Sequence, residues 1–113
     1  MNATVSTLPR EVIKRSGERA AFDGAKIRSA LERAGAATGE FGADEAALLA
    51  AQAGKVLIHR FQGQAPGIEQ IQDVVEHTLI AANHLKTARA YIVYRERHAT
   101  LRKDRQTLVN VEA

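Results

Sequence analysis

The chain has 113 residues, of which 45% are hydrophobic and 26% charged, and its formal net charge is +3. This length suits one small globular domain with its own core. Because there is no cysteine, disulfides, thiolate metal sites and cysteine nucleophiles are excluded. No apolar run approaches the roughly 18 residues of a membrane span and no signal-peptide pattern is present, so we expect a cytoplasmic protein. The 21 alanines predict a mainly helical fold.

The first part of the chain predicts an arm followed by a β-hairpin. Residues 1–10 are largely polar and show no periodicity, so we expect a flexible N-terminal arm. Two short extended runs, 11–15 and 18–22, flank Ser16-Gly17, a pair typical of turns. The second run has poor strand preference because it contains two consecutive alanines.

Four helices are predicted after the hairpin. Asp23 is a suitable N-cap for the first helix. Its apolar positions follow a helical spacing, at Ile27, Ala30, Leu31 and Ala34. The second helix begins near Asp44, and its small and apolar positions predict close packing along a face with Ala47, Ala50, Ala51, Gly54, Leu57, Ile58 and Phe61.

The third and fourth helices complete a bundle. The third has an apolar stripe at Ile68, Ile71, Val75, Leu79 and Ala82. The fourth runs from about Leu85 to Arg105, with Leu85, Ala88, Ile92 and Ala99 on one side. Since short loops favour antiparallel neighbours, we expect a mainly α fold: a small four-helix bundle capped by the hairpin or by a short three-stranded sheet.

Charge is unevenly distributed. Residues 10–33 have a net charge of about +3, residues 40–85 about −4, and residues 86–105 about +5. If the two basic segments meet in space, they form a positive site that attracts phosphates. Basic side chains also commonly do no more than solvate helix faces.

Enzyme motifs are missing. The sequence contains no phosphate-binding loop of the Walker type, no dinucleotide fingerprint and no zinc-protease motif, and its four histidines lack metal-ligand spacing. Three carboxylates, Glu69, Asp73 and Glu76, share a face of the third helix. We expect them to be solvated and to offset the helix dipole rather than to act in catalysis. An independent enzyme is therefore disfavoured.

Basic residues form the informative pattern. Lys14 and Arg15 adjoin the hairpin turn, and Lys26 lies in the first turn of a helix, where free backbone N–H groups favour an anion. Arg95 and Arg97 follow on the last helix. Lysine as a point charge and arginine as a fork both suit phosphates. The spacing fits nucleotide binding, nucleic-acid binding or a plain basic surface.

Nucleic-acid binding is the main alternative, because the sequence pI is about 9.6. Against it, the basic groups are split between two segments. The sequence also has no zinc finger, basic zipper or aromatic stacking platform.

Three ordered segments, which together extend over about residues 11–98, carry a family resemblance. They are Val12–Gly17 with Phe22-Asp23 and Lys26-Ile27, then Ile68–Glu76, then Ala88–Arg97. In this order and spacing they resemble the ATP-cone domain. That family senses nucleotides at the N-terminus of ribonucleotide reductases and in a repressor of their genes. The repressor carries a cysteine zinc ribbon, for which this chain has no cysteines.

The resemblance also implies a domain plan. Residues 11–100 would form the cone, and residues 101–113 a linker toward a catalytic domain. The stretch Leu101–Val109 resembles the approach to the catalytic part of anaerobic, glycyl-radical ribonucleoside-triphosphate reductases. The chain would then be the regulatory head of a larger enzyme, with a free-standing cone as the alternative.

Ligands and residue roles are implied in the same way. The effectors would be ATP, which activates, and dATP, which inhibits, with Mg²⁺ as companion ion. Partners would be the reductase catalytic domain and further copies of the cone. The implied contacts are Val12 and Ile27 to base and sugar, Lys14, Arg15, Lys26 and Arg97 to phosphates, Gln72 near the base, and Asp23 to sugar or base. Val12 and Ile27 fit a hydrophobic core equally well.

Overall fold

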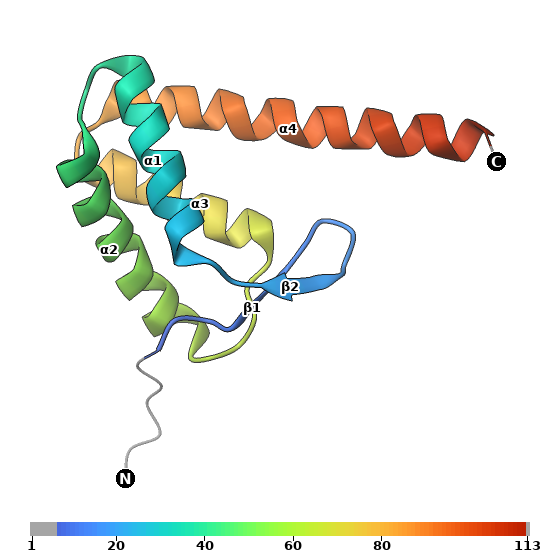
Figure 1. Ribbon diagram of the computed structural model, residues 1–113, viewed down its shortest axis with the longest axis horizontal. Coiled ribbons are helices and arrows are strands. Elements are labelled where there is room, and N and C mark those ends of the chain that lie inside the picture. Colours follow the sequence, from blue (N-terminus) through green and yellow to red (C-terminus); the bar gives the residue numbers. More distant parts are fainter. Residues whose placement is uncertain (1–6, 113) are drawn as a thin grey trace, which may run out of the picture.

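The computed structural model describes the backbone of residues 7–112 and the side chains of residues 7–99. Four helices pack into a bundle, and a β-hairpin lies at one end of it (Figure 1). The elements in chain order are β1 (Glu11–Ile13), β2 (Arg19–Ala21), α1 (Gly24–Thr38), α2 (Ala43–Phe61), α3 (Ile68–Ala81) and α4 (Leu85–Glu112). This confirms the predicted mainly α fold with a small sheet.

The bundle has two ends with different structural elements. The hairpin end comprises β1, β2, the loop 62–67 and the first turns of α1 and α3 (Figure 1). The loop end comprises the connections 39–42 and 82–84 and the first turn of α4. Because consecutive helices run antiparallel, α1 and α3 both begin at the hairpin end, whereas α2 and α4 begin at the loop end (Figure 1).

The hairpin has two antiparallel strands with Val12 paired to Ala20. The Lys14 carbonyl accepts a hydrogen bond from Gly17 N–H at 2.9 Å, which closes the turn. Gly17 has φ of 92°, a conformation that side-chain-bearing residues rarely adopt. Ile13 of β1 also forms an isolated bridge with Gly67, which is not part of a strand. The described residues therefore form a two-stranded sheet, not the three-stranded sheet given as the alternative.

Part of the predicted N-terminal arm is docked. Residues 1–6 lie outside the described residues, but Pro9 is buried. Leu8 lines a cavity with Phe22, Ile27 and Gly54, where the segment before β1 meets α1 and α2. Residues 8–10 therefore belong to the folded body.

The first helix begins as predicted. The Asp23 carboxylate accepts a hydrogen bond from Ala25 N–H at 3.0 Å, which caps α1. The helix ends at Gly39, whose φ of 76° suits a glycine C-cap.

The second helix corrects the predicted apolar face. Its buried residues are Ala46, Leu49, Ala53 and Leu57, whereas Ala47 and Ala51 are exposed. Alanine occurs on several faces of this helix, so the periodicity is ambiguous. The rotation that occurs places both Leu49 and Leu57 in the core, which buries more apolar surface than burying alanines would.

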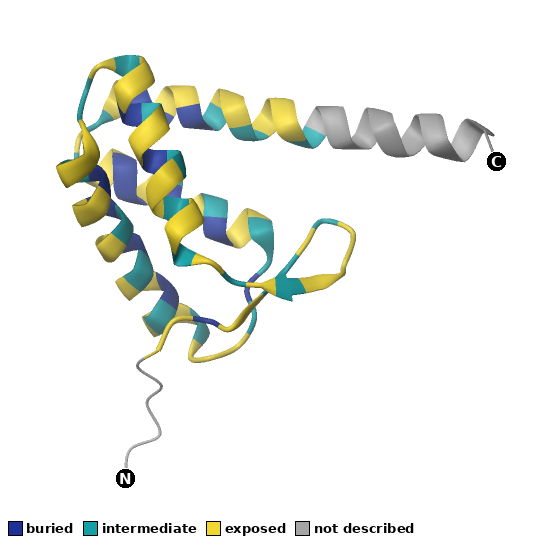
Figure 2. Ribbon diagram, viewed as in Figure 1, coloured by how far each residue is buried: buried dark blue, intermediate teal, exposed yellow. Residues whose placement is uncertain are grey.

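The core lies where the four helices meet, as the dark blue ribbon segments in Figure 2 show. Its buried hydrophobic members are Leu31, Ala46, Leu49, Ala53, Leu57, Ile71, Val74, Val75, Leu79, Ala88 and Tyr91. Most of these side chains are aliphatic, as the composition predicts. Leu85, which the sequence placed on the same side of α4 as Ala88, is 54% exposed at the very start of the helix, whereas Ala88 is buried.

The last helix is longer than predicted. It continues to Glu112 rather than ending near Arg105, and it projects well beyond the other helices (Figure 1). Residues 101–112, predicted as a linker, are therefore helical. Over the described range 7–112, no helix combines the length and the apolar character needed to cross a membrane.

Candidate functional site

The hairpin end brings together most of the basic residues that the sequence singled out. Ile13 N–H donates to the Pro66 carbonyl at 2.8 Å, which ties β1 to the loop that precedes α3. The hairpin turn at Lys14 and Arg15 consequently lies next to the beginning of α3 (Figure 1). The first turn of α1, with Lys26, is at the same end. Two helix N-termini, each with free N–H groups and the positive end of the dipole, therefore face this region.

Arg15 is the residue that joins the hairpin to α3. Its guanidinium donates from Nη2 to Gln72 Oε1 at 3.1 Å, and its Nη1 lies 2.8 Å from Glu69 Oε2. The Arg15 side chain is only 19% exposed, whereas that of Glu69 is 67% exposed. The structure thus places two of the predicted site residues, Arg15 and Gln72, in direct contact, and adds Glu69.

The other predicted phosphate-binding cations have no such partner. Lys14, Lys26 and Arg97 are exposed, and none forms an ion pair with any described side chain of residues 7–99. Lys26 lies one turn from the Asp23 cap, and its N–H donates to the Asp23 carbonyl at 3.1 Å. Unpaired cations are free to meet an anionic ligand without breaking a bond first.

Val12 and Ile27 both pack against the core and are half-buried. The role in the hydrophobic core that the sequence allowed for them is therefore confirmed. Their exposed remainder is available for contact with a ligand. Asp23 is exposed and acts as the helix cap.

The acidic face of α3 is not simply solvated, contrary to expectation. Arg95 Nη1 lies 2.8 Å from Asp73 Oδ1 and 2.9 Å from Glu76 Oε1. Arg95 Nη2 also donates to the Glu69 carbonyl at 3.2 Å. Although burial would lower the pKa of Arg95, the hydrogen bonds to Asp73 and Glu76 outweigh it and raise that pKa. These carboxylates therefore fasten α3 to α4.

A cavity of about 390 Å³ lies where the hairpin turn, α3 and α4 meet. It is lined by Arg15, Glu69, Asp73, Glu76, Ile92, Arg95, Glu96 and Ala99. The sequence named Arg95 as part of the basic pattern but not as a site residue, and it did not single out Glu69 as a partner. The acidic spacing on α3 together with arginines on α4 was the signal that could have found this network.

Arg97 is set apart from this network. It lies two positions after Arg95, which is about 200° around the helix. Because Arg95 faces α3, Arg97 is exposed on the far side of α4. The structure does not bring it into contact with Arg15 or Gln72.

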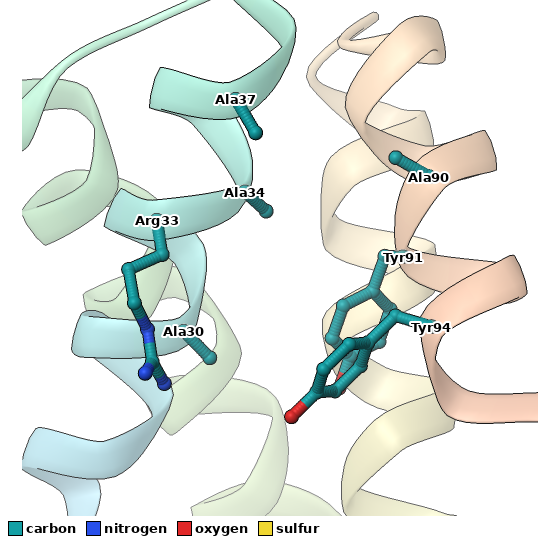
Figure 3. Close-up of a pocket in the computed structure, with 7 residues that line it drawn as sticks. All are labelled: Ala30, Arg33, Ala34, Ala37, Ala90, Tyr91 and Tyr94. Atoms are coloured by element: carbon teal, nitrogen blue, oxygen red, sulfur yellow. The ribbon is translucent and has the colours of Figure 1, made fainter. Parts of the chain in front are cut away.

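A second cavity, of about 340 Å³, lies between α1 and α4. Its walls are mostly alanines with two tyrosine rings, and Arg33 is at its rim (Figure 3). Burial raises the pKa of Tyr91 to about 12, so its phenol is neutral at physiological pH. None of the residues predicted to bind a ligand lines this cavity.

Comparison with known proteins identifies the family. The ATP cone domain model matches residues 10–100, which includes the hairpin and most of the bundle. The chain therefore belongs to the ATP-cone family.

Several relatives are ribonucleotide reductases of different kinds. The chain is 35% identical over 97 residues to the anaerobic ribonucleoside-triphosphate reductase of Haemophilus influenzae, covering 86% of this chain and 14% of that protein. It is 37% identical over 103 residues to the ribonucleoside-diphosphate reductase subunit alpha of Chlamydia muridarum, covering 83% and 10%. It is 38% identical over 94 residues to the vitamin B12-dependent ribonucleoside-diphosphate reductase of Mycobacterium tuberculosis, covering 83% and 13%. The chain thus spans only a small part of the length of these relatives.

Proposed function

We propose that this chain is an allosteric adenine-nucleotide sensor that regulates the overall activity of a ribonucleotide reductase. The observation that carries the proposal is the family match over residues 10–100. Three different kinds of reductase share this segment, which supports a regulatory role independent of the reductase chemistry. In this proposal ATP activates the enzyme and dATP inhibits it.

The proposed ligand lies at the hairpin end. Lys14, Arg15 and Lys26 hold the phosphates, supported by the N-terminus of α1, and Mg²⁺ arrives with the phosphate chain. The half-buried Val12 and Ile27 contact the base and sugar. Gln72 recognises the base and Asp23 the sugar or base. Arg97 is assigned to the phosphate-binding set from the family resemblance alone, since it lies on the side of α4 that faces away from Arg95's partners on α3.

The partners follow from the same proposal. Residues 11–100 form the sensing domain, and the helical segment 101–112 connects it to a catalytic domain in a longer cytoplasmic protein. The anaerobic, glycyl-radical kind of reductase is the first candidate for that domain. Copies of the cone associate with one another when the bound effector changes the surface they present.

Calorimetric titration tests the proposal directly. The purified chain is titrated with ATP, dATP, AMP and a DNA duplex in the presence of Mg²⁺. We expect saturable binding of both triphosphates, weaker binding of AMP, and no comparable affinity for the duplex. Duplex binding that falls steeply with salt, without nucleotide binding, would instead support the nucleic-acid alternative.

A further inference from the structure

Arg15 differs from the other cations of the proposed site. Of Lys14, Arg15, Lys26 and Arg97, it alone has an ion-pair partner among the described side chains of residues 7–99. That partner is Glu69, in the first turn of α3, at 2.8 Å. The second arm of the Arg15 fork is also taken, by Gln72 at 3.1 Å.

A phosphate and the Glu69 carboxylate need the same N–H groups. A guanidinium presents its donors in a planar fork that matches the paired oxygens of either a carboxylate or a phosphate. The contacts with Glu69 and Gln72 use two of the five N–H donors, but they direct both Nη atoms of Arg15 to α3. A phosphate that binds the fork formed by the two Nη atoms must therefore displace Glu69. The two anions are therefore alternatives for one cation.

We propose that Glu69 is a built-in competitor that lowers the affinity of the site for nucleoside triphosphates. This inference rests on the proposed function, because it assigns Arg15 to the phosphates. In the free protein Glu69 holds Arg15 against α3. On binding, the phosphates displace the carboxylate and take over Arg15. Glu69 is 67% exposed, so water solvates it after release, and its place in the first turn of α3 remains favourable to a negative charge.

The neighbouring acids do not compete in this way. Asp73 and Glu76 are both paired with Arg95, whose side chain is only 14% exposed. The Glu18 carboxylate, on the hairpin, accepts a hydrogen bond only from the Ser16 hydroxyl among the described residues, while the Glu18 carbonyl accepts from Lys14 N–H within the turn. Glu69 is thus the one acid among the described side chains that engages a cation of the proposed site through its carboxylate.

The expected effect is modest. Exposed ion pairs contribute about 0.2–1 kcal/mol, so releasing Arg15 should tighten ATP binding by about 1.5- to 5-fold. In the wild type, the competition by Glu69 would raise the ATP concentration needed for half-saturation by this factor. The factor would also diminish at high salt, since the Glu69 carboxylate of the competing pair is exposed.

Calorimetry on variants of the chain separates competition from a general charge effect. The variants are Glu69→Gln, the matched control Glu18→Gln, Arg15→Gln and the double variant Glu69→Gln/Arg15→Gln. Both glutamate variants remove one negative charge at the hairpin end, but only one of them frees Arg15. We expect Glu69→Gln to tighten ATP binding more than Glu18→Gln does, and to give no such excess gain in the Arg15→Gln background. Adenosine, which has no phosphate, should bind equally to wild type and Glu69→Gln.

Two results would overturn the inference while leaving the proposed function intact. One is ATP binding by the wild type with no greater gain in Glu69→Gln than in Glu18→Gln. The other is an excess gain in Glu69→Gln that persists without Arg15. If the wild type fails to bind ATP at all, the proposed function itself fails. Thermal unfolding of each variant checks that all are folded.

Discussion

The two ends of the bundle use their polar groups in opposite ways. At the loop end they are bonded to one another. The Glu40 carboxylate accepts from Thr87 N–H at 2.7 Å and from the Thr87 hydroxyl at 2.6 Å, which caps the N-terminus of α4. The Thr38 hydroxyl lies 2.7 Å from the Thr87 hydroxyl, at hydrogen-bonding distance. His84 Nε2 lies 2.8 Å from Glu45 Oε2, and this contact links the loop before α4 to α2.

At the hairpin end Arg15 and Arg19 pair with Glu69 and Glu11, whereas the two lysines are left without ion-pair partners among the described side chains. Lys14 and Lys26 are exposed and form no ion pair with described side chains. The hairpin itself has only three residue pairs, so it has little stability of its own. This difference teaches that the loop end uses its polar groups to join elements of the fold, whereas the hairpin end keeps two exposed lysines unpaired among the described side chains, which the proposed function assigns to phosphates. Changes at one end should alter stability, and changes at the other should alter binding.

The largest expected effect is on binding, from Lys14→Ala. A charge-assisted contact to phosphate contributes about 1.5–3 kcal/mol, so ATP affinity should fall by that amount, and AMP affinity by less. The free energy of unfolding without ligand should stay close to that of the wild type, because Lys14 has no partner to lose. Calorimetry and thermal unfolding measure the two quantities. Equal losses for AMP and ATP would place Lys14 away from the phosphates.

Gly35→Ala tests the packing near the loop end, and Gly54→Ala, at a glycine in α2, is its comparison. A Cβ at Gly35 would overlap the ring of Phe41, which itself packs against His84. Gly35→Ala should therefore destabilise the fold by about 1–2 kcal/mol, although alanine is the better helix former. At Gly54 the nearest atom would be a Leu8 methyl at 3.4 Å, an ordinary contact. Gly54→Ala should instead stabilise the fold by about 0.5–1 kcal/mol.

Chemical denaturation of the two variants measures whether each substitution raises or lowers the free energy of unfolding. If both stabilise, Phe41 moves aside without cost and the loop end is less tightly packed than the structure indicates. ATP affinity of the folded protein should be unchanged in Gly35→Ala, since the substitution is remote from the hairpin end.

Asp23 concerns both stability and binding, because it caps α1 and lies at the hairpin end, where the nucleotide is proposed to bind. Asp23→Ala should lose about 1 kcal/mol of stability with the cap, and Asp23→Asn much less, since asparagine is also a good N-cap. If Asp23 also contacts the sugar, the alanine variant should narrow the ratio of ATP to dATP affinity. Titration with both nucleotides, alongside thermal unfolding, measures this. An unchanged ratio with reduced stability would limit Asp23 to the cap.

The smallest expected effect is the pH dependence of the loop end. The hydrogen bond from the Thr87 hydroxyl holds the pKa of Glu40 below its usual value of 4.5. A carboxyl with a lowered pKa stabilises the fold above its unfolded pKa, and this contribution disappears as the pH falls through its folded pKa. Glu40→Gln should therefore have a lower Tm than the wild type at neutral pH, and the gap should begin to narrow below about pH 4.5 and close as the pH falls through the lower pKa of the folded state.

Glu32→Gln is the control for that measurement. Glu32 is an exposed acid of α1 with no ion pair among the described side chains. Its substitution should leave the difference in Tm small at every pH. A pH-independent gap for Glu40→Gln would show that the amide and the carboxylate cap α4 equally well.

The sequence by itself determined the element order, the hairpin, the Asp23 cap and the family. These features depend on neighbouring residues: a Ser-Gly turn, a capping side chain, and apolar residues at a helical spacing. The centre of the predicted stripe on α3, Ile71, Val75 and Leu79, is buried as its helical spacing indicates, and Val74 and Thr78 extend it. The face of α2 was not predicted correctly, because alanine is compatible with both exposed and buried positions.

Only the tertiary structure decided which charges meet. Arg15 and Glu69 pair although they are 54 positions apart in the sequence, and Arg95 on α4 pairs with Asp73 on α3. Helical spacing fixes the direction of a side chain around its own axis, but the packing of α3 against α4 selects its partner. The same packing turned Arg95 toward the acidic face and Arg97 away from it. Charge pairing depends on distances between elements, and local sequence patterns do not contain those distances.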